Sequence, residues 1–246
     1  MSAERNEVEI QNMPELPYAV EEAVNRLRVN ISFLGNEIRK IMVISTLPNE
    51  GKSFIAMQLW NQMAKTGISS VLVDADLRKS VTAEKYAIRR KDGKKIKGSS
   101  HFLANDDPIE EAILHTELEH GDILPNVENV VNPSMLLESE RFERMLDYMA
   151  ENYRYVFVDS PPLELVSDGE KIGSLCDGAI LVVRGGSTSK GMVKNSIRQL
   201  ERAGCPLLGI VLNRVEGANG GYYYKKYGGG KYYGSKYYTD SYYYKK

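Results

Sequence analysis

Residues 41–60, IMVISTLPNEGKSFIAMQLW, decide the fold of this chain. They begin with a short apolar run, continue through a polar loop and end in a stretch whose apolar residues have helical spacing. The loop closes with Gly51-Lys52-Ser53, the end of the phosphate-binding pattern of Gly, four residues, Gly-Lys-Ser/Thr. Thr46 stands where that pattern has its first glycine. Because N–H groups at a helix N-terminus attract anions, this strand, loop and helix predict a phosphate-binding site.

The same alternation of apolar run and helical segment continues on the C-terminal side. Continuous apolar runs, rather than alternating ones, are typical of strands buried on both faces of a parallel sheet. Helix-like segments at 134–150 and 190–203 lie between them. The pattern predicts a doubly wound α/β fold with a mostly parallel sheet. The further predicted strands lie at 70–76, 155–162, 178–186 and 206–214.

Composition divides the 246 residues into three parts. Residues 1–18 read as an irregular lead-in, 19–216 as the α/β domain and 217–246 as a low-complexity tail. The tail holds 11 of the 16 tyrosines and, from Tyr222 onward, carries a net charge of +5, which leaves −6 on the rest. With so few aliphatic residues it cannot offset its ordering entropy, so we expect it to be disordered.

Other features bear on location and partners. No stretch approaches the ~20 apolar residues that span a bilayer, and the N-terminus does not read as a signal peptide. Cys176 and Cys205 stand in apolar contexts and are expected to be buried free thiols, which favours the cytoplasm. The basic segment 89–100 is interpreted as a solvated loop, with nucleic-acid binding as its alternative.

Carboxylates follow two of the predicted strands. Asp74 and Asp76 end the run that begins at residue 70, and Asp159 ends the run that begins at 155. Ligand and catalytic groups of open α/β sheets gather at the carboxyl ends of strands, and such acids hold hard cations directly or through water. Together with the phosphate-binding loop they predict a magnesium–nucleotide site.

These three segments resemble the Walker A, A′ and B motifs of the bacterial tyrosine kinase family. The resemblance rests on residues 45–53, on VLVDADLR at 71–78 and on VFVDSPP at 156–162, and it extends to Asn132-Pro133-Ser134 and the tyrosine-rich C-terminus. It implies a P-loop fold like that of the partitioning and cell-division ATPases. It also implies an ATP- and magnesium-dependent protein-tyrosine kinase that serves capsule or exopolysaccharide synthesis and export.

The resemblance also implies roles for individual residues. Lys52 would contact the β- and γ-phosphates, while Ser53, Asp76 and Asp159 would hold Mg²⁺. Asp74 would orient or deprotonate the incoming tyrosine hydroxyl. Asn213 would read adenine, with a strand-end cap as the alternative interpretation. The catalytic set is thus Lys52, Asp74, Asp76 and Asp159, and the nucleotide-binding set is Pro48, Asn49, Glu50, Gly51, Lys52, Ser53, Phe54 and Asn213.

Assembly is a further implication of the resemblance. The family carries Glu-x-x-Arg-x-x-Arg on its first helix, and the matching residues here are Glu22, Asn25 and Arg28, with Arg26 one step away. Glu22, Arg26 and Arg28 are therefore interface candidates for a ring-like homo-oligomer. A membrane activator of the polysaccharide co-polymerase type and a cognate phosphotyrosine phosphatase are implied as partners, with the kinase peripheral at the inner face of the membrane and no nucleic acid bound.

The tail fits a substrate role. Its 25 residues from Tyr222 could extend ~80–90 Å, so transfer in trans to a neighbouring subunit's tail is geometrically easy. An adhesive or RNA-associating segment is the alternative interpretation of the tail. A partitioning-type switch ATPase and a non-enzymatic scaffold are the alternatives for the whole chain. The expected phosphorylation sites are Tyr222, Tyr223, Tyr224, Tyr227, Tyr232, Tyr233, Tyr237, Tyr238, Tyr242, Tyr243 and Tyr244.

Overall fold

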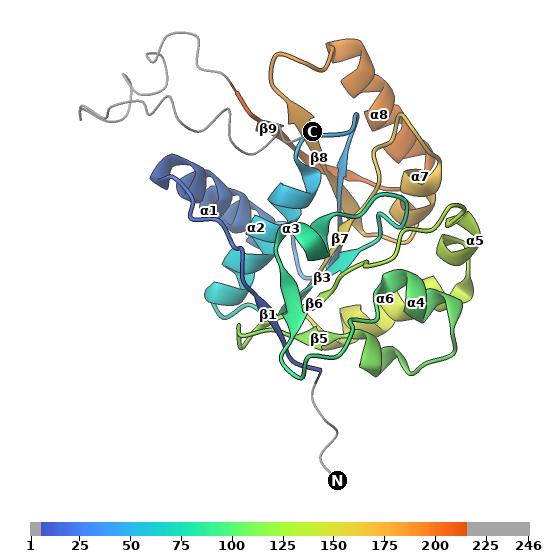
Figure 1. Cartoon of the computed structure of the whole chain (residues 1–246). Helices are drawn as coiled ribbons and strands as arrows, with labels where there is room; N and C mark the ends of the chain where they lie inside the picture. The colour runs from blue at the N-terminus through green and yellow to red at the C-terminus, as the bar shows by residue number, and fades with distance from the viewer. Residues whose placement is uncertain (1–5, 216–246) are drawn as a thin grey trace, which may run out of the picture. The chain divides into compact units, whose positions relative to one another are not determined.

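A seven-stranded sheet in the order β5-β6-β3-β7-β2-β8-β9 forms the centre of the molecule (Figure 1). The computed structural model describes residues 6–215, so the predictions made for the tail lie outside the described residues. Every strand pair in this sheet is parallel except β5 with β6, which confirms the predicted doubly wound α/β fold. The strands are β2 Lys40–Ser45, β3 Ser70–Asp74, β5 Leu114–His115, β6 Gly121–Leu124, β7 Tyr155–Asp159, β8 Gly178–Arg184 and β9 Leu207–Asn213.

Helices cover both faces of the sheet, as Figure 1 shows. On one face, α1 (Tyr18–Ser32) packs on α2 (Lys52–Lys65), which buries Trp60 and Met63 against the strands. On the other face, apolar residues of α6 (Glu140–Asn152), α7 (Asp168–Gly173) and α8 (Lys190–Arg202) join a second core cluster. The shorter helices are α3 Thr82–Lys85, α4 Ser99–Ala104, η1 Ile109–Ala112 and α5 Ser134–Leu137.

Strand β2 lies at the point where the chain reverses its direction across the sheet. The chain leaves β2 for β3 and β6 on one side, returns through β7, and then adds β8 and β9 on the other side. Loops at such a switch point part from each other and leave a crevice outside the carboxyl ends of the strands, where ligands bind in open α/β sheets. The phosphate-binding loop follows β2, so the topology places it at this crevice.

The lead-in expected to be irregular contains a strand. β1 (Val8–Ile10) pairs antiparallel with β4 (Ile88–Arg90), and Val8 and Ile10 are buried while Glu9 is exposed. The alternation buries two apolar side chains in the same cluster as Ile88. It covers only three residues and therefore does not stand out in the sequence. The segment predicted as one helix at 134–150 is two helices, because Ser139 accepts a hydrogen bond from Phe142 N and caps a new start at α6.

Strand β9 departs from the expectation of burial on both faces. It is the edge strand of the sheet, and Ile210 and Leu212 are 46% and 64% exposed. Their counterparts on β8, Leu181 and Val183, are buried. A continuous apolar run does not distinguish a central strand from an edge strand, because the difference depends on which neighbours the topology supplies.

Two phenylalanines provide a matched test of the core. Phe157 on the central strand β7 is fully buried, so Phe157→Ala is expected to lower the free energy of unfolding by about 3–5 kcal/mol. Phe33, just beyond α1, is 80% exposed, and Phe33→Ala is expected to change the free energy of unfolding by less than about 0.5 kcal/mol. Urea denaturation of both variants measures the difference, and equal losses would contradict the assignment of the core.

Candidate active site

The phosphate-binding loop connects β2 to α2 with its backbone in left-handed conformations at two positions. Gly51 has φ +100° and Asn49 has φ 62°, and α2 begins at Lys52 without a side-chain cap. The first N–H groups of a helix have no partner within the helix. Here they remain available to an anion, which is the arrangement that a phosphate group needs.

The ammonium group of Lys52 lies among buried carboxylates. Its Nζ is 3.0 Å from Asp76 Oδ2 and 3.9 Å from Asp159 Oδ1. Burial lowers the pKa of Lys52, but the negative charges of Asp159 and Asp76 outweigh this and hold it above its ordinary value. The structure thus brings together the loop lysine and the carboxylates of β3 and β7, as the positions of these residues at strand ends predicted.

Asp74 is the most deeply buried of the three carboxylates, at 2% exposure. Ser80 Oγ donates a hydrogen bond to Asp74 Oδ2, and the backbone N–H of Asp76 donates to Oδ1 at 3.2 Å. Burial and the neighbouring charge of Asp159 raise the pKa of Asp74 to about 7, although the Ser80 hydroxyl acts in the opposite direction. A carboxylate with a raised pKa is a better proton acceptor than an ordinary aspartate.

The residues present fit a magnesium ion that also binds phosphate. Burial raises the pKa of Asp159, and its Oδ1 has no hydrogen-bond partner among residues 6–215. Such an orphaned oxygen, with Asp76 and the Ser53 hydroxyl nearby, suits a hard cation. Within the same residues no group of three or more His, Cys, Asp or Glu side chains could hold a metal by itself. Mg²⁺ would therefore need phosphate oxygens or water as additional ligands.

The other predicted nucleotide-binding residues lie in different environments. Pro48 and Asn49 are exposed on the loop, and Phe54 is partly buried below Lys85, whose Nζ is 5.8 Å from the ring centroid. The carboxylate of Glu50 accepts hydrogen bonds from Leu47 N at 2.7 Å and Arg184 N at 3.0 Å, within the protein. The Glu50 carboxylate is thus engaged inside the protein, and the roles of Pro48, Asn49 and Phe54 toward a nucleotide stay predictions.

Asn213 lies against the phosphate-binding loop. Its Nδ2 donates to the backbone carbonyl of Glu50 at 2.8 Å, and a Cβ on Gly51 would come within 2.1 Å of the same nitrogen. The positive φ of Gly51 favours a glycine at this position, and a larger residue would also displace the Asn213 side chain. The contact ties Asn213 to the phosphate-binding loop, and both interpretations of this residue, adenine recognition and strand-end cap, stay predictions.

Several polar contacts near the site were missed by sequence reasoning. The guanidinium of Arg78 pairs with the buried carboxylate of Asp168 at 2.5 and 3.0 Å, and Ser134 Oγ donates to Asp168 at 3.1 Å. The hydrogen bond from Ser80 Oγ to Asp74 was also not predicted. These partners lie up to 90 residues apart, and no local pattern marks them.

The interface candidates lie on α1, which packs on α2 rather than on the carboxylate cluster. Arg28 donates through Nε and Nη2 to Asn25 Oδ1 at 3.0 and 2.9 Å, so Asn25 fixes this arginine along the helix surface. Arg26 is exposed and Glu22 partly exposed. Their role in assembly stays a prediction.

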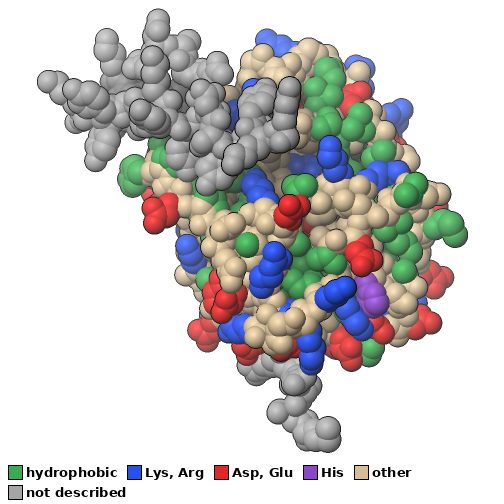
Figure 2. All heavy atoms as spheres, viewed as in Figure 1, with side chains coloured by type: hydrophobic (Ala, Val, Ile, Leu, Met, Phe, Trp, Pro, Cys, Tyr) green, Lys and Arg blue, Asp and Glu red, His purple; other side chains and the backbone are tan. Residues whose placement is uncertain are grey.

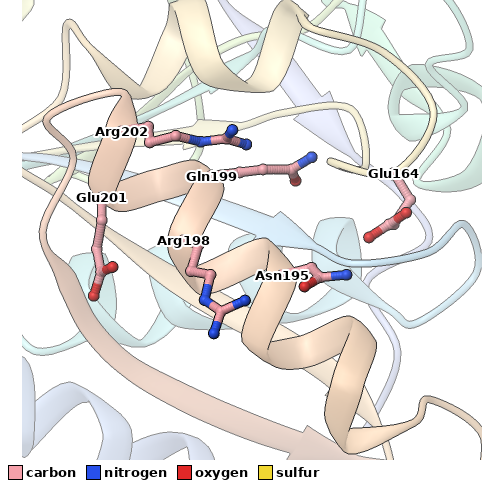
Figure 3. A pocket seen from close by; sticks show the side chains of 6 residues that line it. All are labelled: Glu164, Asn195, Arg198, Gln199, Glu201 and Arg202. Atoms are coloured by element: carbon pink, nitrogen blue, oxygen red, sulfur yellow. The ribbon is translucent and has the colours of Figure 1, made fainter.

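Two other surface features lie outside the carboxylate cluster. A shallow hollow on α8 is lined by Asn195, Arg198, Gln199, Glu201 and Arg202 together with Glu164 (Figure 3). In the basic segment, Arg90 pairs with Asp92, Lys91 with Glu7 and Lys97 with Asp107. Figure 2 shows basic and acidic side chains interspersed on the visible face rather than a continuous basic surface.

Comparison with known proteins agrees with this site. Residues 39–170, which contain the loop and all three carboxylates, match the family model described as AAA domain. Tyrosine-protein kinase CpsD of Streptococcus agalactiae is 32% identical over 195 residues, covering 79% of this chain and 83% of that protein. Tyrosine-protein kinase etk of Escherichia coli is 30% identical over 79% of this chain, which corresponds to 26% of that longer protein.

Solved structures give the same result. The chimerical protein CapA2B2 is 30% identical with a TM-score of 0.72, covering 84% of this chain and 92% of that chain. The kinase domain of Escherichia coli tyrosine kinase ETK is 26% identical with a TM-score of 0.72, covering 91% and 87%. MinD of Pyrococcus horikoshii, solved with Mg-ADP, is 22% identical with a TM-score of 0.60 over 71% and 70%, which shows a common fold.

The fold and the loop define a nucleotide-binding protein of the P-loop class. Within that class, the chain belongs to the bacterial tyrosine kinase family. Among residues 6–215, no helix combines the length and the apolar character needed to cross a membrane.

The buried carboxylate of Asp74 predicts a pH-dependent stability of the nucleotide- and metal-free protein. Its pKa is higher in the folded than in the unfolded chain, so the folded state binds more protons, and the free energy of unfolding falls as the pH rises from about 4 to about 7. Asp74→Asn is expected to reduce this fall and to be more stable than the wild type at pH 8 by about 1–3 kcal/mol.

Urea denaturation between pH 5 and pH 8, in the presence of a chelator, measures this effect. Asp106→Asn, at an exposed position, is the matched control and should follow the wild type. Parallel pH curves for wild type and Asp74→Asn would show that Asp74 is not held at a raised pKa.

Proposed function

We propose that this chain is an ATP-dependent protein-tyrosine kinase that phosphorylates its own C-terminal tyrosine cluster in trans. The observation that supports the proposal is the meeting of the Lys52 ammonium with Asp74, Asp76 and Asp159 beside the N-terminus of α2. A chain with 11 tyrosines after this domain carries its own acceptors. The similarity to proteins named tyrosine-protein kinases supports the same activity.

The reaction would transfer the γ-phosphoryl group of ATP to a tyrosine oxygen, with ADP as the leaving group. The loop N–H groups would hold the phosphates, and Lys52 would exchange Asp76 for phosphate oxygens. Asp74 would accept the proton of the tyrosine hydroxyl, in place of the hydrogen bond that it now receives from Ser80. Mg²⁺, held by Ser53, Asp76 and Asp159, would neutralise the charge that develops on the phosphates.

The proposed wider setting of the activity rests on the resemblance to the bacterial tyrosine kinase family. We propose a ring-like homo-oligomer assembled through Glu22, Arg26 and Arg28 of α1. Its partners would be a membrane activator of the polysaccharide co-polymerase type, which keeps the kinase at the inner face of the membrane, and a cognate phosphotyrosine phosphatase. The role would be control of capsule or exopolysaccharide synthesis.

Loss of the loop lysine tests the kinase activity. Wild type is expected to gain phosphate on tail tyrosines during incubation with Mg-ATP, and Lys52→Met is expected to lose at least about 100-fold of the rate. Lys65→Met, at an exposed position at the other end of the same helix, should retain it. Mass spectrometry of the tail is the measurement. ATP hydrolysis without phosphotyrosine would instead favour the switch ATPase.

A mixed reaction tests transfer in trans. A full-length chain with the 11 tail tyrosines changed to Phe supplies the active site, and Lys52→Met supplies the acceptor tail. Phosphate is expected on the tail of Lys52→Met, because the tail is long enough to enter a neighbouring site. If the wild type phosphorylates its tail but the mixture yields no phosphate on the tail of Lys52→Met, transfer occurs within one chain.

Phosphorylation is also expected to loosen the oligomer. Each phosphotyrosine adds roughly −1.5 to −2 charges, so three of them cancel the tail's +5 and further ones make it repel an acidic domain. Light scattering before and after quantitative phosphorylation is expected to show a smaller particle. The oligomer of the chain with Phe in place of the tail tyrosines should keep its size. A wild-type oligomer of unchanged size after phosphorylation would contradict the expected loosening.

A further inference from the structure

The carboxylate of Glu50 is a buried anion inside the phosphate-binding loop. It is 2% exposed, and three donors surround it: Leu47 N at 2.7 Å, Arg184 N at 3.0 Å and the hydroxyl of Thr188. Buried carboxylates are costly unless they are hydrogen-bonded in this way. The side chain is therefore held in one place by groups from two separate parts of the chain.

Those two parts are the phosphate-binding loop and the loop between β8 and α8. Leu47 belongs to the first, whereas Arg184 ends β8 and Thr188 precedes α8. Oε1 accepts from both Arg184 N and Thr188, while Oε2 accepts from Leu47 N. One carboxylate thus bridges two loops 134 to 138 residues apart in the sequence.

Other contacts hold the same loop from neighbouring elements. Asn213 at the end of β9 donates to the carbonyl of Glu50, and Ser196 of α8 donates to Thr46 Oγ1 at 3.0 Å. Thr46 occupies the position of the first glycine of the phosphate-binding pattern. Side chains on the β8 and β9 side thus hold the phosphate-binding loop in place. A glycine at position 46 could not form the hydrogen bond that Thr46 makes with Ser196.

We propose that Glu50 is a positioning residue for nucleotide binding, and that Thr188 acts through it to hold the phosphate-binding loop in its cradle conformation. In this role neither side chain would need to contact the phosphates. Thr188 secures one carboxylate oxygen of Glu50, whose other oxygen fixes Leu47 N and hence the path of the backbone toward Gly51. The proposal rests on the nucleotide binding proposed for this site.

Removal of the Thr188 hydroxyl tests the proposal. Thr188→Val keeps the shape of the side chain and removes its donor, and on the order of tenfold weaker binding of Mg-ADP is expected, because a hydrogen bond to a buried charge is lost. Thr188→Ser keeps the hydroxyl and should restore most of the affinity. Ser187→Ala, an exposed neighbour in the same loop, should bind like the wild type.

Isothermal titration calorimetry with Mg-ADP gives the affinities, and steady-state kinetics adds a second readout. A positioning role predicts a raised KM for ATP with a smaller change in kcat for Thr188→Val. A purely structural role would lower the melting temperature while leaving the affinity of the folded protein unchanged, and this result would overturn the proposal. Glu50→Gln is a second variant. It replaces one of the two acceptor oxygens with an NH₂ group, which donates, and should weaken Mg-ADP binding at least as much as Thr188→Val.

The wild-type titration separates the two claims. Wild type that binds no Mg-ADP would refute the nucleotide site itself. Wild type that binds, with equal affinity in Thr188→Val and Glu50→Gln, would refute only the positioning role.

Discussion

The ammonium group of Lys52 lies among three buried carboxylates that it cannot fully neutralise. Three carboxylates and one ammonium leave an excess of negative charge in a region with little water, which is unfavourable without a further cation or proton. Burial is the first cause of the raised pKa values of Asp74 and Asp159, and the negative charges of neighbouring carboxylates add to it. A divalent cation bound among these carboxylates would relieve this excess of negative charge, so the charges that destabilise the metal-free protein favour the binding of a cation.

The sheet topology creates this cluster. β3 and β7 are parallel neighbours with Asp74 opposite Asp159, and β7 also pairs with β2, from which the phosphate-binding loop departs. Acids at the ends of these strands therefore reach the helix N-terminus that carries Lys52. On the other side of β2, the Glu50 carboxylate ties the loop to the end of β8. The loop is held from both sides while the first N–H groups of α2 remain available.

Much of this arrangement could be predicted from the sequence, because strands, helices and strand ends are local properties. Lys52, Ser53, Asp74, Asp76 and Asp159 lie at such ends, and a parallel sheet collects them at one edge. The contacts of Asp168 and Thr188 could not be predicted in this way, since they join segments whose proximity depends on the complete fold. The bond of Ser80 to Asp74 spans only six residues, but no local motif marks it. The β1–β4 ribbon was missed because its strands have only three residues each.

A crystal structure with bound Mg-ADP is the decisive measurement for this site. We expect the β-phosphate at the N-terminus of α2, with Lys52 Nζ moved from Asp76 to a phosphate oxygen and Mg²⁺ held near Ser53, Asp76 and Asp159. A structure in which Lys52 keeps its 3.0 Å contact with Asp76 while the nucleotide lies elsewhere would contradict this expectation.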